Sequence, residues 1–324
     1  TGADPADVTV TASVGELNGN ISAGTFDAST VDLITLTDDV SITTSALVNA
    51  GVDDTSISLG DLNGSHHLAL EANVADAEIY LRDANIASLT ITDTNGDTLG
   101  ADGVFFNGDF VTSGLVDVNA TTEITLAAGA SVNAGGDVDL ITATLTSNGG
   151  IRSDGDVTLG DGTTVLVDVN GGVVGEGLID INAATVQISE EIASNNGVID
   201  IDAGNSVTFD VNGNLIGSDQ ADGTLGASVD AADITVNAPL DNDEGGLDLA
   251  ATGTLDINED LDAAGDIDLD GDMLIALATG ADITSNGDVN VNDDLLGDGA
   301  PGASTITSDE GDINFAGDIG TDGL

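Results

Sequence analysis

The chain has 324 residues, and 59 Asp and Glu against two Lys and Arg give it a formal net charge of −57 at pH 7. This charge excludes nucleic acid and anionic lipid as direct partners, because both are bound through Lys and Arg. The absence of Cys excludes disulfides and thiolate metal sites, and no apolar run approaches the roughly 18 residues needed for membrane insertion.

Aromatic residues make up only 2% of the chain, so Val, Ile, Leu and Ala must form its core. A thin core of branched aliphatic residues suits stacked strands better than a globular interior. The lack of Cys and Lys and the abundance of Gly, Thr, Asn and Asp fit an extracellular or cell-surface product. Residues 1–7 have neither a basic nor an apolar signal region, so we expect a mature chain or a piece of a longer one.

In residues 1–113, short runs alternate apolar and polar residues, with Gly, Asn and Asp between the runs. A period of two directs one face of a strand inward and the other to water. We therefore expect an irregular β-solenoid or an N-terminal capping part here. The expected strands are 8–10, 31–36, 57–59, 68–70, 79–81 and 89–91.

Three Phe residues, Phe105, Phe106 and Phe110, interrupt this pattern. One interpretation is an inserted loop, or a junction between the irregular and the regular part. The other is that these aromatic side chains fill a wider coil.

A short motif recurs through residues 114–324: Gly, any residue, an aliphatic residue, then Asp, Asn or Thr, then another apolar residue. It recurs at steps of about 20 residues in its most regular stretch. The motif begins at Gly114, Gly136, Gly155, Gly177, Gly197, Gly245, Gly253, Gly265, Gly287 and Gly311.

Each motif predicts a short strand, and the Gly before it predicts a tight corner, because Gly permits positive φ. A step of about 20 residues fits one coil of a parallel β-helix, in which each coil buries its apolar face only by stacking on its neighbours. We therefore expect an all-β parallel β-solenoid of about 15 coils. The alternative is a β-sandwich of antiparallel hairpins, because pairs such as Asn148-Gly149 and Asp154-Gly155 also mark two-residue hairpin turns.

The motif residues 136–140, 265–269 and 287–291, read as Gly-Asp-Val-Asp-Leu, Gly-Asp-Ile-Asp-Leu and Gly-Asp-Val-Asn-Val, are similar to known repeats. They resemble the β-helical repeats of filamentous-haemagglutinin-type adhesins and autotransporter passengers, most clearly over residues 114–324. The resemblance implies a right-handed parallel β-helix, export to the cell surface, and a role in adhesion, filament or matrix formation.

A first candidate calcium site consists of Asp93, Asn95 and Asp97, whose oxygen side chains alternate around Gly96 as in calcium-binding loops. The competing interpretation is an ordinary turn rich in Asp and Asn.

A second candidate consists of Asp266, Asp268 and Asp270, which match the first half of an EF-hand loop. The second half of that loop fails, because Leu277 stands where a bidentate Glu is needed. The aliphatic residues between the three Asp fit a core, so the Asp side chains would lie on the outer face of a strand.

Stacking of coils would bring Asp residues of neighbouring coils about 4.8 Å apart, which is destabilising for like charges. A cation between coils would relieve this repulsion, as would alternation of Asp with Asn or Thr. Asp139, Thr158, Asp180 and Asp200 occupy one repeat position and show such alternation.

Adjacent carboxylates occur throughout this acidic chain, so such a pair carries almost no signal for a glycosidase. Enzymes with a β-helix fold that act on acidic sugars need basic residues, and this chain has only Arg82 and Arg152. We therefore expect no enzyme and no required cofactor, with calcium as the one candidate ion.

The sequence thus favours an extracellular structural protein, a β-solenoid subunit of a surface filament, matrix or fibrous adhesin. Its open sheet edges predict association with itself, end to end. The alternatives are a monomeric adhesin or module that binds surface glycans, and a β-helix enzyme that degrades a neutral polysaccharide.

Overall fold

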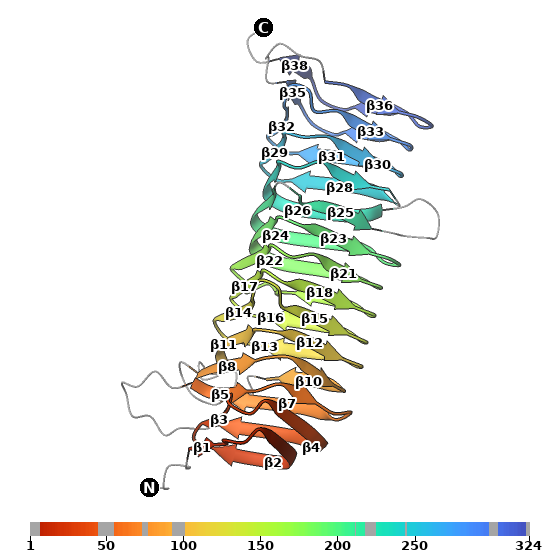
Figure 1. Cartoon of the computed structure of the whole chain (residues 1–324). Coiled ribbons are helices and arrows are strands. Elements are labelled where there is room, and N and C mark those ends of the chain that lie inside the picture. Colours follow the sequence, from red (N-terminus) through yellow and green to blue (C-terminus); the bar gives the residue numbers. More distant parts are fainter. Residues whose placement is uncertain are drawn as a thin grey trace. The chain divides into compact units, whose positions relative to one another are not determined.

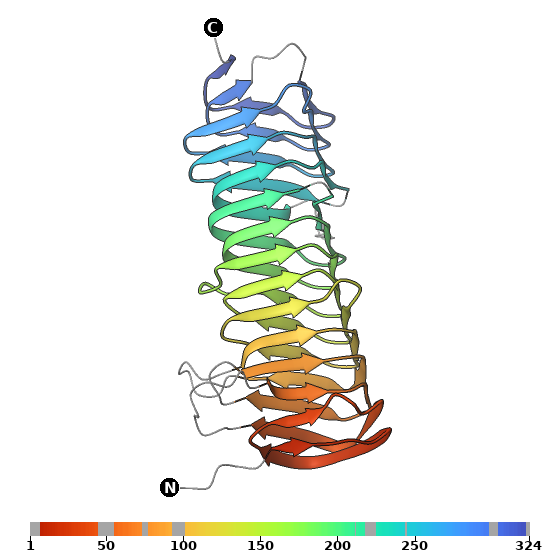
Figure 2. The same ribbon diagram turned by 60° about the vertical axis from the view of Figure 1, so that its left-hand side comes forward.

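The chain forms a parallel β-solenoid with turns of about 22 residues and no helix in the part that the structure describes. The structure is a computed structural model, and it describes residues 7–44, 55–72, 77–92, 101–210, 212–217, 225–243, 245–297 and 304–321. The chain divides into two compact units, Thr1–Thr164 (unit 1) and Val165–Leu324 (unit 2). Within each unit the strands follow one another in coils (Figure 1, Figure 2).

The predicted parallel β-solenoid is confirmed, and the alternative of antiparallel hairpins is wrong for the described strands, which pair in parallel. The solenoid has about 13 turns rather than about 15, because the turns are longer than the motif suggested. Val138 pairs with Val157, but Ile199 pairs with Ala227, so the length of a turn varies along the chain.

Unit 1 contains three stacks of parallel strands, each of which joins every coil to the next. The first is β1–β3–β5–β8–β11–β14–β17, the second is β2–β4–β7–β10–β13–β16–β19, and the third is β6–β9–β12–β15–β18. The strands are β1 Val8–Thr9, β2 Val14–Ala23, β3 Phe26–Ala28, β4 Leu33–Thr44, β5 Thr55–Leu59, β6 Leu62–Asn63, β7 His67–Ala72, β8 Ala77–Leu81, β9 Ala84–Ile86, β10 Ser88–Ile91, β11 Ala101–Phe106, β12 Asp109–Thr112, β13 Val116–Asn119, β14 Glu123–Leu126, β15 Ser131–Ala134, β16 Val138–Ile141, β17 Thr144–Ser147, β18 Gly150–Ser153 and β19 Val157–Leu159.

Unit 2 continues the same construction, with a separate four-stranded sheet formed by β27, β30, β33 and β36. Its longer strands β22, β24 and β26 each carry a register shift, where the strand turns a corner of the coil. The strands are β20 Leu166–Val169, β21 Val173–Gly175, β22 Ile179–Ile188, β23 Glu191–Ser194, β24 Ile199–Phe209, β25 Asn214–Gly217, β26 Leu225–Val236, β27 Leu240–Asn242, β28 Gly246–Ala251, β29 Thr254–Ile257, β30 Leu261–Ala263, β31 Ile267–Gly271, β32 Leu274–Leu277, β33 Ile283–Ser285, β34 Val289–Val291, β35 Leu295–Gly297, β36 Ile306–Ser308, β37 Ile313–Phe315 and β38 Ile319–Thr321.

The core consists of aliphatic side chains that stack on their equivalents in the neighbouring coils. Val116 pairs with Val138 and Val138 with Val157, and all three are fully buried. Burial of each such side chain contributes roughly 1.5–3 kcal/mol. A single coil has no second layer, so its core positions are covered only when another coil lies on each side.

The glycines that open the motif serve close packing, and the positive φ that Gly permits is not used at them. Among the described residues, positive φ occurs at Gly19, Gly64, Gly129, Gly160 and Gly280, and none of these opens a motif.

A Cβ added at four of the motif glycines would collide with an Asp side chain of the preceding coil, and at five others it would meet backbone atoms instead. The four are Gly155, Gly253, Gly287 and Gly311, and the five are Gly114, Gly136, Gly197, Gly245 and Gly265. A carbon placed at Gly287 would lie 2.1 Å from Asp266 Oδ1, and one placed at Gly155 would lie 2.1 Å from Asp137 Oδ1. The space left by these two glycines is therefore filled by a carboxylate.

That carboxylate links consecutive coils by a hydrogen bond. Asp266 Oδ1 accepts the backbone N–H of Asp288 at 2.7 Å, and Asp288 Oδ1 accepts that of Asp312 at 2.7 Å. In unit 1, Asp137 Oδ1 accepts the N–H of Asp156 at 3.0 Å. The Gly-Asp pair of the motif is therefore a structural device that ties one coil to the next.

The Phe-rich stretch is part of the coils, so its interpretation as an inserted loop is wrong. Phe106 ends β11 and Phe110 lies in β12, and both are buried with their rings edge to face at 5.4 Å. They fill the coil interior, as the second interpretation predicted. Phe105 points to the outer face and is only half-buried.

Candidate functional site on the acidic face of unit 2

Two columns of acidic residues run across the coils of unit 2 on the outer face of β22, β24, β26, β28 and β31. They lie outside because they alternate with buried aliphatic residues along each strand. The first column pairs in register as Asp180, Asp200, Ser228, Asp248 and Asp268. The second column pairs as Asn182, Asp202, Asp230, Ala250 and Asp270. We call these ten positions the acidic face.

Carboxylates of the acidic face are held close together in a partly dry environment. Burial raises the pKa of Asp200, and the charges of Asp202, Asp180 and Asp230 raise it further. Burial also raises the pKa of Asp248, followed by the charges of Asp268, Asp230 and Asp270. The acidic face is therefore an array on which a proton or a cation relieves repulsion.

Amide side chains continue the first column beyond Asp268. Asn290 donates from Nδ2 to Asp268 Oδ1 at 2.6 Å, and Asn314 donates from Nδ2 to Asn290 Oδ1 at 2.9 Å. Here an Asn in place of an Asp turns the repulsion between coils into a hydrogen bond, as the alternation in the sequence predicted.

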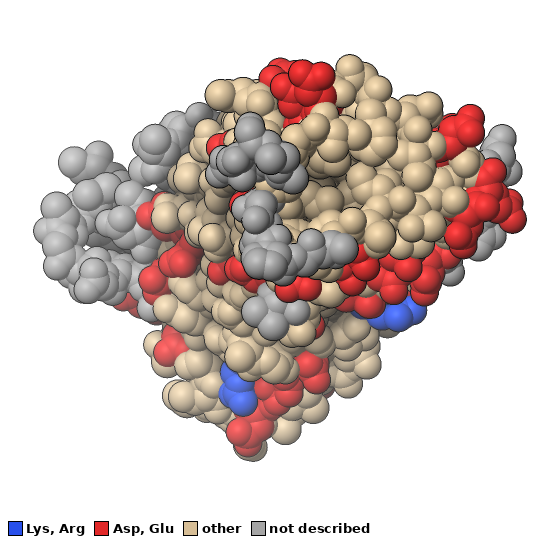
Figure 3. All heavy atoms as spheres, turned by 90° about the horizontal axis from the view of Figure 1, so that it is seen from above, with Lys and Arg blue, Asp and Glu red and all other residues tan. Residues whose placement is uncertain are grey.

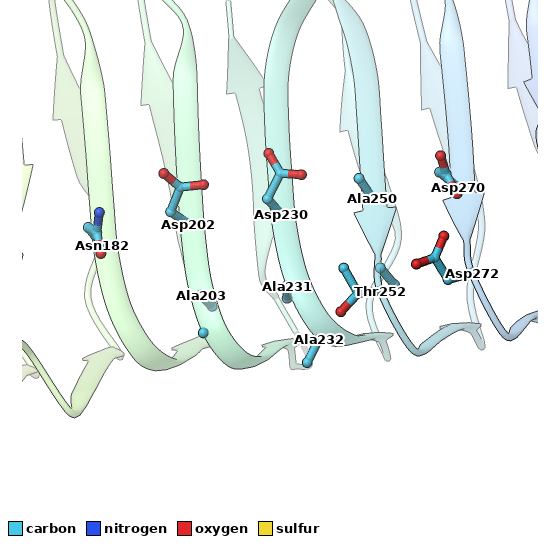
Figure 4. Close-up of a pocket in the computed structure, with 12 residues that line it drawn as sticks. Asn182, Asp202, Ala203, Asp230, Ala231, Ala232, Ala250, Thr252, Asp270 and Asp272 are labelled. Atoms are coloured by element: carbon cyan, nitrogen blue, oxygen red, sulfur yellow. The ribbon is translucent and has the colours of Figure 1, made fainter. Parts of the chain in front are cut away.

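A groove of about 430 Å³ lies along the second column. Figure 4 shows Asp202 and Asp230 on neighbouring strands, and Ala250 where the next carboxylate of the column would be. The small side chain of Ala250 leaves a hollow between Asp230 and Asp270. No Lys, Arg or His lines this groove, so its chemistry is that of carboxylate acceptors above small apolar residues.

One end of the groove carries three carboxylates close enough to share an ion. One carboxylate oxygen from each of Asp270, Asp272 and Asp293 lies within 4.8 Å of the other two, and of these residues Asp270 and Asp272 line the groove. Burial, a hydrogen bond to Asp293 and the charges of Asp293 and Asp272 raise the pKa of Asp270. Calcium prefers carboxylate oxygens at 2.3–2.6 Å, so these three residues could hold one.

The second predicted calcium segment is distributed along this region rather than gathered around one point. Asp268 and Asp270 lie on the outer face of β31, where alternate side chains are roughly 6.6 Å apart. Asp266 precedes the strand and accepts the N–H of Asp288. Calcium binding by the three residues stays a prediction, and the geometry favours a site across coils over a site along one strand.

The first predicted calcium segment, with Asp93, Asn95 and Asp97, lies outside the described residues. Asp272 and Asp293, which the structure places beside Asp270, were missed by the sequence analysis. Asp293 is far from Asp270 in the sequence, so only knowledge of which coils are neighbours could have connected the two.

Comparisons of the chain with protein-family models, with curated proteins and with solved structures gave no match. In the part of the chain that the structure describes, no helix is long and apolar enough to cross a membrane. By its fold the chain is a β-solenoid protein, and its candidate site is an acidic outer face.

Proposed function

We propose that this protein is an extracellular structural protein, a β-solenoid subunit of a surface filament, matrix or fibrous adhesin, that associates with itself end to end. One observation carries the proposal. The last described coil of unit 2 leaves core positions exposed that are buried in the coil before it.

The comparison between these two coils is direct, because their residues pair in register. Ile313 pairs with Val289 and Phe315 with Val291, and both Val residues are fully buried. Ile313 is 40% exposed and Phe315 is 39% exposed. Ile319, whose partner Leu295 is buried, is 63% exposed.

Figure 3 looks onto this end of the chain. Most of the described surface there carries neither acidic nor basic side chains, and Asp and Glu gather toward its edges. The exposed apolar side chains of this coil, Ile313, Phe315 and Ile319, can be buried under another coil while the carboxylates stay in water.

The first described coil of unit 1 offers a matching partner. Val8, Leu17 and Ile21 are not fully buried, although they pair with residues that are. Those buried partners are Phe26, Leu36 and Ile42. Strands at the edge of a sheet present unpaired N–H and C=O groups, which a strand of another copy can take up in parallel register.

We further propose that the protein is not an enzyme and requires no cofactor. The carboxylates of the groove lie side by side on one sheet face, whereas glycoside hydrolysis needs two carboxyl groups on either side of the bond that is cut. The absence of basic residues from the groove lining supports the same proposal.

The test compares the wild-type chain with Phe315→Asp by sedimentation velocity and negative-stain electron microscopy. Val111→Asp is the matched control, because Val111 is also 39% exposed but lies on the outer face of β12. We expect wild type and Val111→Asp to form end-to-end assemblies, and Phe315→Asp to remain as single particles. Each protein is imaged with calcium and with a chelator.

Single particles of wild-type protein in both conditions would overturn the filament proposal and favour the monomeric adhesin. Assemblies that survive Phe315→Asp unchanged would show that the contact lies elsewhere. Assemblies that need calcium would connect the cluster of Asp270, Asp272 and Asp293, or the segment 93–97, to assembly.

A further inference from the structure

A pair of stacked aromatic rings lies on the outer face of unit 1. Tyr80 in β8 pairs in register with Phe105 in β11, and their ring centroids are 4.9 Å apart with an interplanar angle of 15°. Both side chains are half-buried. The two rings therefore form a small aromatic surface on the side wall of the solenoid, away from its core.

This placement is unusual for the chain, which has one Tyr, six Phe and no Trp. Four of the other Phe residues are 0–1% exposed and belong to the core: Phe26, Phe106, Phe110 and Phe209. Phe315 lies in the last described coil, where core positions are exposed. Tyr80 and Phe105 alone are aromatic residues in outward positions flanked by coils on both sides.

A second column of residues, beside Tyr80 and Phe105 on the same strands, leaves space for the rings and places hydrogen-bond acceptors next to them. Glu78, Gly103 and Glu123 pair in register on three successive coils. A Cβ at Gly103 would lie 2.7 Å from Phe105 Cε2 and 3.5 Å from Glu123 Cγ, so the Phe105 ring leans over the glycine between the two Glu residues.

Glu78 fixes the orientation of the tyrosine. The Tyr80 hydroxyl donates to Glu78 Oε2 at 2.6 Å. Glu78 and Glu123 are two coils apart, which separates their backbones by roughly 9–10 Å. The aromatic surface is thus bordered by carboxylates that accept hydrogen bonds and cannot donate them.

From this geometry we propose that Tyr80, Phe105, Glu78 and Glu123 form a binding site for a neutral saccharide. A pyranose ring has an apolar C–H face that packs on an aromatic ring, and a rim of hydroxyl donors that carboxylates accept. Binding sites of this kind combine an apolar surface with a few placed polar groups.

Other ligand classes fit less well. Nucleotides and acidic sugars carry negative charge, which Glu78, Glu123 and a net charge of −57 repel. An apolar protein surface needs a larger contact area than two half-buried rings provide. The saccharide site is independent of end-to-end assembly, because it lies on the side of the coils.

The competing explanation is that Phe105 merely covers the backbone of Gly103, as aromatic residues do for glycines in sheets. Phe105→Leu separates the two explanations. Leu keeps an apolar cover over the glycine, but it removes the aromatic face on which a sugar would pack.

The test uses the fluorescence of Tyr80, the only Tyr in a chain without Trp, together with titration calorimetry. The probes are cellohexaose, xylohexaose, mannohexaose and chitohexaose, with hexagalacturonate as the acidic counterpart. We expect at least one neutral probe to change the emission saturably, and hexagalacturonate to cause no change.

For that probe we expect calorimetry to show affinity about tenfold weaker in Phe105→Leu, which corresponds to the loss of one aromatic contact. Glu123→Gln is expected to weaken binding severalfold, and Val111→Ala, an exposed apolar residue on another face, to bind like wild type. Circular dichroism checks that each variant is folded. The titration is repeated on Phe315→Asp, so that its result does not depend on assembly.

No saturable response to any neutral probe at millimolar concentration would overturn the proposal. Equal affinity of Phe105→Leu and wild type would also overturn it, because the ring would then serve only to cover Gly103.

Discussion

At Tyr80, a phenol and a carboxylate share a short hydrogen bond, so the only Tyr of the chain reports on Glu78. The hydrogen bond from Tyr80 to Glu78 raises the pKa of Tyr80 to about 12, and burial and the charges of Glu78 and Glu123 act in the same direction. The cause is stabilisation of the protonated phenol, which donates to the carboxylate, and destabilisation of a phenolate beside it.

We predict that Glu78→Gln lowers the pKa of Tyr80 from about 12 toward its ordinary value of 10. Absorbance at 295 nm measures the titration of this single phenol, with circular dichroism to confirm that the protein stays folded. Glu123→Gln is the control and should have a smaller effect, because Glu123 acts through charge alone. An unchanged titration in Glu78→Gln would contradict the assigned cause.

At Gly287, the requirement for glycine is one of space. A Cβ there would lie 2.1 Å from Asp266 Oδ1 and 3.0 Å from the backbone N of Asp266, so Ala forces the linking carboxylate out of place. We predict that Gly287→Ala lowers the free energy of unfolding by roughly 1–3 kcal/mol, measured by urea denaturation.

Gly162→Ala is the matched control for this substitution. No atom lies within 4 Å of a Cβ at Gly162, and its φ is not in the positive range. The control should change stability by less than about 0.5 kcal/mol. Equal effects at Gly162 and Gly287 would mean that the linking Asp does not determine the choice of glycine.

At the scale of the strands, the sequence pattern predicts that the strands run parallel, but it does not predict which residues of neighbouring coils pair. The sequence correctly indicated a parallel solenoid, because every motif repeats the same inward aliphatic positions and these must stack. It underestimated the length of a turn, because some turns, such as the one from Ile199 to Ala227, contain residues that the motif does not count.

The same limit explains which parts of the candidate sites were missed. The outward positions of Asp268 and Asp270 follow from alternation along one strand, so the sequence could place them. The approach of Asp293 to Asp270 and the stacking of Phe105 on Tyr80 depend on register between coils. Where turns differ in length, that register cannot be counted from the sequence.

Along the first column of the acidic face, we predict that Asp248→Asn stabilises the protein. Burial and the charges of Asp268, Asp230 and Asp270 raise the pKa of Asp248, so its charged form opposes folding. An amide at this position can donate to Asp268, as Asn290 already does. The free energy of unfolding at pH 7 should rise by roughly 0.5–1 kcal/mol, measured by urea denaturation.

Asp282→Asn should have the opposite sign and serves as the comparison. Hydrogen bonds from the side chain and the backbone N–H of Thr305 lower the pKa of Asp282, so its charged form favours folding. A decrease in stability for Asp248→Asn would show that its carboxylate makes a favourable contact, with a bound cation for example.

In the whole molecule, the excess of carboxylates makes stability depend on pH in two opposite ways. Groups with raised pKa, which include Asp117, Asp180 and Asp200, bind protons more tightly when folded. Their protonation therefore stabilises the folded state as the pH falls from neutral toward their raised pKa values. Groups with lowered pKa, such as Asp27 and Asp161, stabilise the folded state above the ordinary value of 3.8 and lose this contribution as the pH falls below it.

We therefore predict that the melting temperature at low ionic strength rises as the pH is lowered from 7 to about 5, and falls again below about pH 3.5. Scanning calorimetry measures this profile. Screening by about 0.15 M salt should reduce the rise, because part of it comes from repulsion between carboxylates that salt weakens. Calcium at pH 7 should raise the melting temperature more than sodium of equal ionic strength if carboxylates such as Asp270, Asp272 and Asp293 share the ion. A melting temperature that falls steadily from pH 7 to pH 5 would mean that favourable hydrogen bonds to carboxylates outweigh their mutual repulsion. The carboxylates of the acidic face would then stabilise the folded state without a bound cation.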